Sequence, residues 1–254
     1  MADLLQQVSK KESEVIAPLG KSASNPPLQS LEFQTRNSRD SYLATQLRDI
    51  SGKDPLVRKN IRIFERGAHI FFEGDQSLAL YVIYSGSIKA YLTTEGGEEL
   101  VLGFYLPRDV VGLDGIENEV HQSSAVALET TSVCKFVFAQ LSESDRARGF
   151  PKIFSAQLAR DYRLLVILSK KDANGRVASF LCDFARRFET NGYSSSEFHL
   201  SMSRHDIGNY LGLAVETISR TLTHFQASGL IDVDRRAIKI NDPEILRQIA
   251  GAGC

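Results

Sequence analysis

Residues 203–220 read SRHDIGNYLGLAVETISR, and this stretch decides the fold of the C-terminal part of the chain. Two short segments with helical apolar spacing flank a glycine, which is typical of a helix-turn-helix. Ser203 can cap the first helix, with Asp206 at the third helical position as a variant of the capping box. Gly212 is expected to make the turn. The inward face of the first helix is predicted to comprise Ile207, Tyr210 and Leu211.

The second helix of this pair is predicted to carry side chains that read DNA bases. Its inward residues recur at three- and four-residue spacing: Val215, Ile218 and Leu222. Glu216, Ser219 and Arg220 therefore turn outward. Arginine can donate two hydrogen bonds to guanine, a carboxylate can accept one from cytosine, and serine suits several base edges. Residues expected to contact the DNA backbone or support the motif are Ser203, Arg204 and Thr217.

Short β-rich runs separated by glycines fill the chain between about residues 61 and 140. This spacing predicts a sandwich or barrel. The clearest hairpin is TTEGGEE, where Gly96 and Gly97 can take positive φ between IKAYLT and ELVLGF. We expect a small jelly roll over 59–148, and an α+β chain as a whole.

A long helix is predicted to follow the jelly roll, over 149–173. Its apolar stripe has spacings of four, three, four and three, and consists of Phe154, Leu158, Asp161, Leu165 and Leu168. This is a heptad seam, and pairing with a second copy of the chain would cover it. The alternative is that the stripe packs only on the β domain of its own chain. Asp161 argues against a wholly dry core there.

Length and composition agree with two domains and a helix between them. The 254 residues exceed a typical single domain. Residues 1–58 contain SASNPP, further Ser and Asn residues and only short amphipathic pieces, so we expect a partly ordered lead-in. The C-terminal domain, 174–254, opens with the helix RVASFLCDFARRFETNG, which is expected to end at a Gly192 C-cap.

Bulk properties exclude several classes of protein. With 43% hydrophobic and 24% charged residues and no long apolar run, the chain has no membrane span. The N-terminus lacks the features of a secretory signal, so a cytoplasmic protein is expected. The net charge of −1 argues against coating nucleic acid by bulk electrostatics. Any DNA binding must come from a local face.

The string DIGNYLGLAVETISR resembles the helix-turn-helix of the CRP/FNR family of bacterial regulators, specifically its FNR-like branch. The resemblance extends over about 60–254 and includes ALETTSVCKF, FARRF, EFHLSMSRHDIGNYLGL and SGLIDV. It implies a double-stranded β-roll of the cyclic-nucleotide-binding type, a dimerisation helix and a winged helix-turn-helix. A homodimer would then bind a palindrome in double-stranded DNA, with half-sites about one turn apart. RNA polymerase is a further partner that the resemblance implies.

Within the motif, the resemblance carries over residue by residue. Glu216, Ser219 and Arg220 match the base-contacting residues of FNR-like proteins, which recognise TTGAT-type half-sites. The CRP-like branch has an additional arginine where this chain has Val215. Ala214 departs from the Thr or Ser usual in the family, and a lost cap costs about 1 kcal/mol.

The signal to which the regulator responds is less evident. Oxygen-sensing FNR proteins resemble four-cysteine iron-sulfur proteins, but residues 1–60 contain no cysteine and only Cys134 has a counterpart. A cluster needs four ligands, so a cluster within one chain is excluded. Cys134 lies in an apolar run and is expected to be a buried structural thiol. Redox sensing by Cys134 or Cys182 is the alternative.

Cyclic AMP is not expected to bind. In the CRP-like branch, the family resemblance implies a phosphate site built from the glutamate of a Gly-Glu-Leu motif and an arginine before Ser-Ala. This chain has Leu113 at the glutamate position and Ser123 at the arginine position, so both charged partners of the phosphate are missing. His69 and His121 are the candidate ligands if a haem were bound, but no cofactor is predicted. Control by abundance, or by repulsion between paired Asp161 side chains across the seam, is a further alternative.

Two other classes of function compete with DNA reading. A cupin-like enzyme or small-molecule binding protein would also use a β-roll, but His69 and His121 do not form the clustered metal site of a cupin. The protein is therefore not expected to be an enzyme. A winged helix that binds protein is the other alternative, and the outward Glu, Ser and Arg argue against it.

Overall fold

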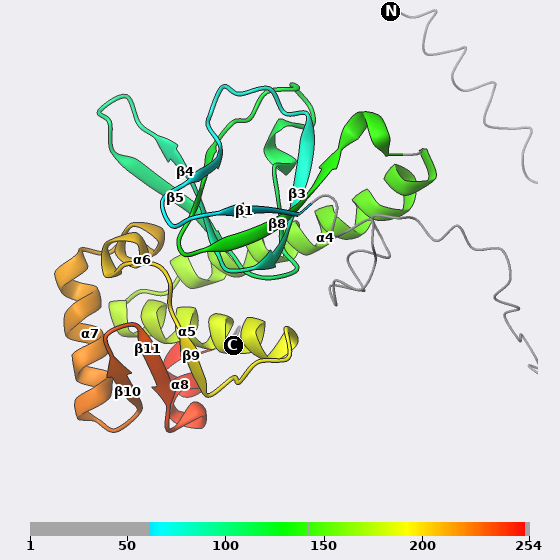
Figure 1. Ribbon diagram of the computed structural model, residues 1–254. Helices are drawn as coiled ribbons and strands as arrows, with labels where there is room; N and C mark the ends of the chain where they lie inside the picture. The colour runs from blue at the N-terminus through cyan, green and yellow to red at the C-terminus, as the bar shows by residue number, and fades with distance from the viewer. Residues whose placement is uncertain (1–60, 142, 252–254) are drawn as a thin grey trace, which may run out of the picture. The chain divides into compact units, whose positions relative to one another are not determined.

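The computed structural model describes residues 61–141 and 143–251. The predicted lead-in, 1–58, lies outside these residues. The described chain comprises a β-roll, a long helix and a winged helix-turn-helix in chain order (Figure 1). The predicted fold class is confirmed.

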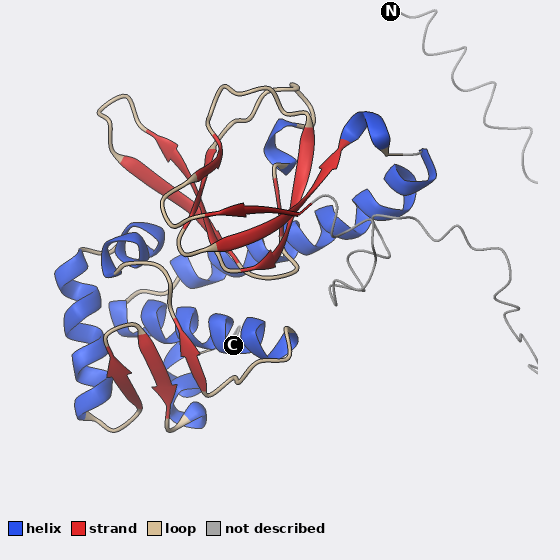
Figure 2. Cartoon of the chain, viewed as in Figure 1, coloured by secondary structure: helices blue, strands red, loops and turns tan. Residues whose placement is uncertain are grey.

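The β-roll consists of two four-stranded sheets whose neighbouring strands are all antiparallel (Figure 2). The first sheet has the order β1 (Ile61–Phe64), β8 (Thr131–Val137), β3 (Ala79–Ser85) and β6 (Val110–Val111). The second has the order β2 (His69–Phe71), β7 (Ser124–Ala127), β4 (Ile88–Thr93) and β5 (Glu99–Tyr105). Two short 3₁₀ helices, η1 (Leu113–Gly115) and η2 (Phe138–Gln140), complete the domain. Apolar residues of both sheets form the roll's interior, as alternation along each strand requires.

The predicted hairpin joins β4 to β5. Gly97 has a φ of 81°, in the left-handed region that glycine adopts without a steric cost. Gly96 keeps a negative φ, so only one of the two glycines supplies the turn conformation expected of both.

Helix α4 (Glu143–Leu168) begins ahead of the predicted start at 149 and ends before the predicted end at 173. It ends early because Asp172 caps the next helix, accepting a hydrogen bond from the Gly175 backbone N–H at 2.8 Å. Ile153 and Ile167 of α4 are buried.

The C-terminal part combines helices with a three-stranded sheet of order β10-β11-β9 (Figure 2). Its elements are α5 (Ala173–Thr190), β9 (Glu197–His199), α6 (Arg204–Leu211), α7 (Val215–Ala227), β10 (Ile231–Asp234), β11 (Ala237–Ile240) and α8 (Pro243–Ala250). Helix α5 ends at Thr190 with Asn191 as its C-cap, one residue before the predicted C-cap Gly192, which follows with a φ of 82°.

The β-roll and the C-terminal part share one apolar core. Phe104 of β5 lies 6.4 Å from Phe180 and 6.2 Å from Phe184 of α5, and 5.0 Å from Tyr210 of α6, between ring centroids. The same core contains Val101 and further residues of α5, α6 and α7. Strand β5 therefore belongs to the packing of both parts.

A buried ion pair reinforces this junction. Arg187 of α5 donates hydrogen bonds at 2.7 Å to the Phe104 carbonyl oxygen and to the Asp109 carboxylate. Arg160 of α4 also contacts the Asp109 carboxylate, at 2.6 Å. Burial alone would lower the pKa of Arg187, but Asp109 and Asp183 outweigh it and the pKa is raised. Asp109 thus joins the β-roll to both helices.

Replacing this carboxylate should destabilise the whole chain. In Asp109→Asn, two guanidinium groups lose their charged partner, and we expect the free energy of unfolding to fall by about 3 kcal/mol. Urea denaturation followed by circular dichroism measures this change. Glu244→Gln, which breaks the exposed pair with Arg247, is the matched control and should change little. Equal midpoints for both variants would contradict the assigned role of Asp109.

Candidate nucleic-acid interface

The first helix of the helix-turn-helix, α6, begins with a complete capping box. The Ser203 hydroxyl accepts from the Asp206 backbone N–H at 3.0 Å, and the Asp206 carboxylate accepts from the Ser203 backbone N–H at 2.9 Å. Gly212 ends the helix with a φ of 63°. Both features confirm the prediction from the sequence, because they depend on residues close together in the chain.

The turn after α6 is tight because Gly208 has no side chain. The Leu213 backbone N–H donates to the Gly208 carbonyl oxygen at 2.8 Å. A Cβ atom at Gly208 would lie 2.6 Å from the Leu213 carbonyl oxygen. Leu211 and Ile218, which pack the two helices together, are fully buried. The angle between α6 and α7 therefore depends on this close approach of backbone to backbone.

Helix α7 presents the predicted base-reading residues on its outer side. Glu216 and Arg220 are exposed and Ser219 is half-buried, and all three border one shallow hollow with Val215. Arg220 Nε lies 3.4 Å from the Glu216 carbonyl oxygen, one turn back on the same face. Ala214 provides no side-chain cap. The three side chains are therefore brought together as the sequence predicts, although their contact with DNA stays a prediction.

The predicted supporting residues lie in two places. Ser203 and Arg204 border a hollow that also includes Arg235 and Arg236 of the wing, and Arg204 is exposed. Thr217 is half-buried in the first turn of α7. Arg204 and Thr217 are thus on different helices, at the start of each.

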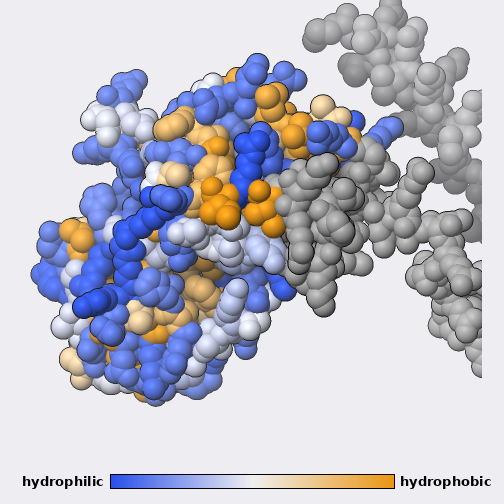
Figure 3. Space-filling view, viewed as in Figure 1, coloured by the Kyte–Doolittle hydropathy of each residue, from blue (hydrophilic) through white to orange (hydrophobic). Residues whose placement is uncertain are grey.

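Sequence reasoning missed the arginines of the wing. The turn between β10 and β11 contains Arg235, which is exposed with a φ of 53°, and Arg236, which donates to the Ser201 carbonyl oxygen at 2.6 Å. The signal was present as DRRA between two short β-rich runs. Arg236 fixes the wing, whereas the Arg235 side chain is exposed at its tip. Figure 3 shows mainly hydrophilic surface over the α7 side of the molecule.

Polar contacts from the β-roll hold α6 in place. Lys89 of β4 is buried and pairs with Glu99 and with Asp206, the latter at 2.9 Å. Burial opposes the charge of Lys89, yet its hydrogen bonds to the two carboxylates raise its pKa. The Asn209 side chain accepts from the Val101 backbone N–H at 2.7 Å. The β-roll thus contacts the capping box of the helix-turn-helix directly.

The Asp114 carboxylate lies at the corner of the β-roll formed by Leu113 and Ser123, the two positions compared above with a cyclic-phosphate site. Asp114 Oδ2 accepts hydrogen bonds from the backbone N–H groups of Gln122 and Ser123 and from the Ser123 hydroxyl, at 2.8 to 3.0 Å. Its Oδ1 lies 3.1 Å from His121 Nδ1. Burial alone would raise the pKa of Asp114, but the hydrogen bonds from His121 and Ser123 outweigh it and the pKa is lowered. These donors are already satisfied within the chain.

The candidate thiols and histidines differ in environment. Cys134 is buried in β8, and burial raises its pKa to about 11, so it is protonated at neutral pH. Cys182 of α5 is half-buried and borders a cavity. His69 Nε2 lies 2.9 Å from the Tyr91 hydroxyl, and His121 stacks on Phe71. Within 61–141 and 143–251, no cluster of three or more His, Cys, Asp or Glu residues is placed to hold a metal.

The predicted seam of α4 is mostly exposed. Phe154, Leu158 and Leu165 are 43%, 50% and 63% exposed, and Leu168 is half-buried. Asp161 is also exposed and accepts from the Gln157 side chain at 2.8 Å. The alternative that the stripe packs only against its own chain is therefore wrong.

Within the part of the chain that the structure describes, no helix combines the length and the apolar character that a membrane span requires.

Comparison with known proteins agrees with this architecture. Residues 61–143 match the cyclic nucleotide-binding domain family, and residues 175–249 match the Crp-like helix-turn-helix domain family. The chain is 40% identical over 214 residues to the transcriptional activator protein Anr of Pseudomonas protegens, covering 82% of this chain and 87% of the relative.

A second relative and a solved structure are similar to the same part of the chain. The fumarate and nitrate reduction regulatory protein of Escherichia coli K12 is 42% identical over 192 residues, covering 74% of this chain and 77% of the relative. Among solved structures, FixK2 from Bradyrhizobium japonicum superposes with a TM-score of 0.68 at 27% identity, covering 76% of this chain and 97% of that structure.

A methyl group at the tight turn should damage the helix-turn-helix. Gly208→Ala places a Cβ against the Leu213 carbonyl oxygen, so we expect a loss of about 1–3 kcal/mol in stability as the turn is forced apart. Gly175→Ala is the control, because its Cβ would meet only ordinary contacts at the start of α5. Thermal unfolding measures both. An unchanged melting temperature for Gly208→Ala would show that the turn tolerates the displacement.

Proposed function

This chain belongs to the CRP/FNR family of transcription regulators, and we propose that it binds a TTGAT-ATCAA palindrome as a homodimer. The observation that carries the proposal is the exposed group Glu216, Ser219 and Arg220 at the start of α7. The family consists of regulators with a helix-turn-helix DNA-binding domain, so the chain is not an enzyme.

The chemistry of the three side chains supports base reading. Arg220 can donate to a guanine, Glu216 can accept from a cytosine, and Ser219 can contact either kind of edge. Within 61–141 and 143–251, Arg220 makes no ion pair with a carboxylate, and its exposed guanidinium group is available to DNA. A Glu at a phosphate would be repelled, so its position at the head of α7 favours a base edge.

The exposed apolar face of α4 supports the homodimer. Phe154, Leu158 and Leu165 lie along one side of a helix of 26 residues, where a second copy of the same helix would cover them. Such pairing has twofold symmetry and matches the symmetry of a palindrome. Asp161 on this face would meet its counterpart, and the repulsion would weaken the dimer.

The β-roll is proposed to act without cyclic AMP or an iron-sulfur cluster. Asp114 already accepts the backbone hydrogen bonds of Gln122 and Ser123, and a phosphate there would be repelled by its charge. Cys134 is the chain's one counterpart of the cluster ligands, and its raised pKa disfavours the thiolate that a metal needs. Cytoplasmic location and contact with RNA polymerase complete the proposal. Relatives named as activators support activation.

Arg220→Ala should weaken binding to the palindrome by about 1–3 kcal/mol and relax the preference at one base pair. The loss of two hydrogen bonds to one base is the reason. Mobility shifts on TTGAT-ATCAA and on a scrambled duplex of equal length, at one fixed salt concentration, measure the effect. Equal affinity of the unaltered protein for both duplexes would contradict specific reading, and would favour the protein-binding alternative if both were weak.

Arg235→Ala in the wing is the matched control for this experiment. Its loss should be uniform across the two duplexes, and the slope of log K against log salt should fall by about one, because a phosphate contact is removed. A sequence-dependent loss at Arg235 would reassign it to base reading.

Leu158→Glu should convert the dimer to a monomer. The introduced carboxylate would be buried opposite the same group of the second copy, so the dimer affinity should fall at least about tenfold. Sedimentation velocity measures the mass. Ala156→Glu carries the same charge at an exposed position about 160° away round the helix, and should remain a dimer. Identical masses for the two variants would exclude the seam as the interface.

A further inference from the structure

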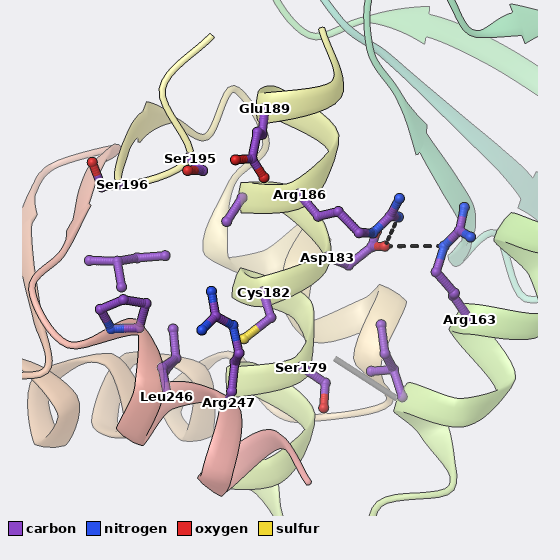
Figure 4. Close-up of a pocket in the computed structure, with 14 residues that line it drawn as sticks. Arg163, Ser179, Cys182, Asp183, Arg186, Glu189, Ser195, Ser196, Leu246 and Arg247 are labelled. Atoms are coloured by element: carbon purple, nitrogen blue, oxygen red, sulfur yellow. Dashed lines mark hydrogen bonds and ion pairs between the residues drawn. The ribbon is translucent and has the colours of Figure 1, made fainter. Parts of the chain in front are cut away.

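The winged helix-turn-helix is held to the rest of the chain at two separate places. The first lies along α5, where Phe104 packs on the helix and Arg187 pairs with Asp109. Asp183 of the same helix also pairs with Arg163 of α4, whose Nε lies 3.2 Å from the carboxylate (Figure 4). All these contacts follow one helix, and contacts along a single axis leave rotation about that axis free.

The second place is a group of polar contacts between the β-roll and α6, together with the segment just before α6. We call this group the clasp. It consists of the pairs Lys89 with Asp206, Asn209 with the backbone of β5, and Ser201 with Glu129. The clasp lies off the axis of α5 (Figure 1), so it prevents the rotation that the first place allows.

Asn209 binds the free edge of the second sheet. Strand β5 is the last in the order β2-β7-β4-β5, so the backbone groups on its outer side have no neighbouring strand. The Asn209 side chain accepts from the Val101 N–H at 2.7 Å and donates to the Glu99 carbonyl oxygen. One amide thus satisfies a donor and an acceptor of the strand, as the peptide group of a further strand would. These bonds are directional, unlike the apolar packing on α5.

Ser201 extends the clasp to the wing. Its hydroxyl donates at 2.7 Å to Glu129, in the turn between β7 and β8, and the Ser87 hydroxyl donates to the same oxygen at 2.8 Å. The Ser201 carbonyl oxygen accepts from Arg236 of the wing at 2.6 Å. The β-roll therefore contacts the winged helix-turn-helix at α6 and, through Ser201, is connected to the wing.

The position of α6 is passed on to α7, because the two helices are packed as one body. Leu211 and Ile218 are buried between them, and the Gly208 turn brings their backbones together. The attachment of α6 to β5 therefore sets the direction in which Arg220 points. In a homodimer formed through α4, it also sets the distance and angle between the two α7 helices.

We propose that the clasp, with Asn209 as its central positioning residue, determines which spacer length between half-sites the homodimer accepts. The proposal rests on the homodimer and palindrome proposed above. Half-sites one turn apart are separated by about 34–36 Å, so one added base pair moves a half-site about 3.4 Å along the duplex and about 35° round it. A domain that cannot rotate about α5 cannot follow this displacement, whereas a domain released from the clasp can.

Mobility shifts test this on a series of palindromes whose spacer is lengthened or shortened one base pair at a time, at one fixed salt concentration. For the unaltered protein, affinity should fall at least about tenfold one base pair from the best spacer, because the misaligned half-site loses its base contacts. In Asn209→Ala this penalty should shrink to about threefold or less, because rotation about α5 restores those contacts. Preference for each half-site base should stay, since Asn209 contacts β5.

Asn191→Ala is the matched control. Asn191 is half-buried like Asn209, and its side chain donates to the Arg187 carbonyl oxygen at 3.0 Å, at the end of α5. This variant loses a comparable hydrogen bond but keeps the clasp, so its affinity should depend on the spacer as in the unaltered protein. Ser201→Ala opens the clasp at its other end and should relax the spacer preference as Asn209→Ala does.

The proposal is wrong if either clasp variant keeps the sharp spacer preference of the unaltered protein. It is also wrong if these variants lose affinity by the same factor at every spacer, which is what a purely structural role predicts, or if the unaltered protein accepts all spacers equally. These outcomes leave the proposed function intact while the palindrome is preferred to the scrambled duplex. Without that preference, the proposed function is wrong and the role of the clasp with it.

Discussion

The buried pair of Arg187 and Asp109 is the constraint on which the arrangement of the chain depends. A guanidinium inside a core is tolerated only when a carboxylate and further acceptors surround it. Here Asp109 and the Phe104 carbonyl oxygen provide that environment, and Arg160 adds a link to α4. The β-roll, the long helix and α5 are thereby held by a single carboxylate. Their apolar contacts at Phe104 then follow from the same placement.

From this junction, polar contacts continue into the helix-turn-helix. Lys89 reaches Asp206, and Asn209 binds the backbone of β5 at Val101, so α6 is held at its start and along its length. Helix α7 differs from α6 at its start. Ala214 gives it no side-chain cap, and Glu216 and Arg220 point outward. The outward side chains at the start of α7 are therefore those proposed to contact base edges. The anchored helix α6 thus positions α7, which carries the proposed base-reading residues.

The two sides of α4 serve different purposes. The exposed apolar side suits a second copy of the chain, and the opposite side packs toward the C-terminal part, where Arg163 pairs with Asp183 of α5. The β-roll corner at Asp114 is already satisfied by groups of the chain itself.

The sequence by itself determined the features that depend on near neighbours. The Ser203–Asp206 capping box, the Gly212 turn and the outward face of α7 follow from helical periodicity and capping, so they were predicted correctly. The β4–β5 hairpin follows from its glycines, although only Gly97 needs positive φ.

Only the tertiary structure decided how these parts meet. Arg187 and Asp109 are 78 residues apart, and Asn209 and Val101 are 108 apart, so no local spacing marks either contact. The wing arginine Arg235 likewise had no periodic pattern to single it out. Their roles arise because long-range packing brings together side chains whose partners a linear pattern cannot specify.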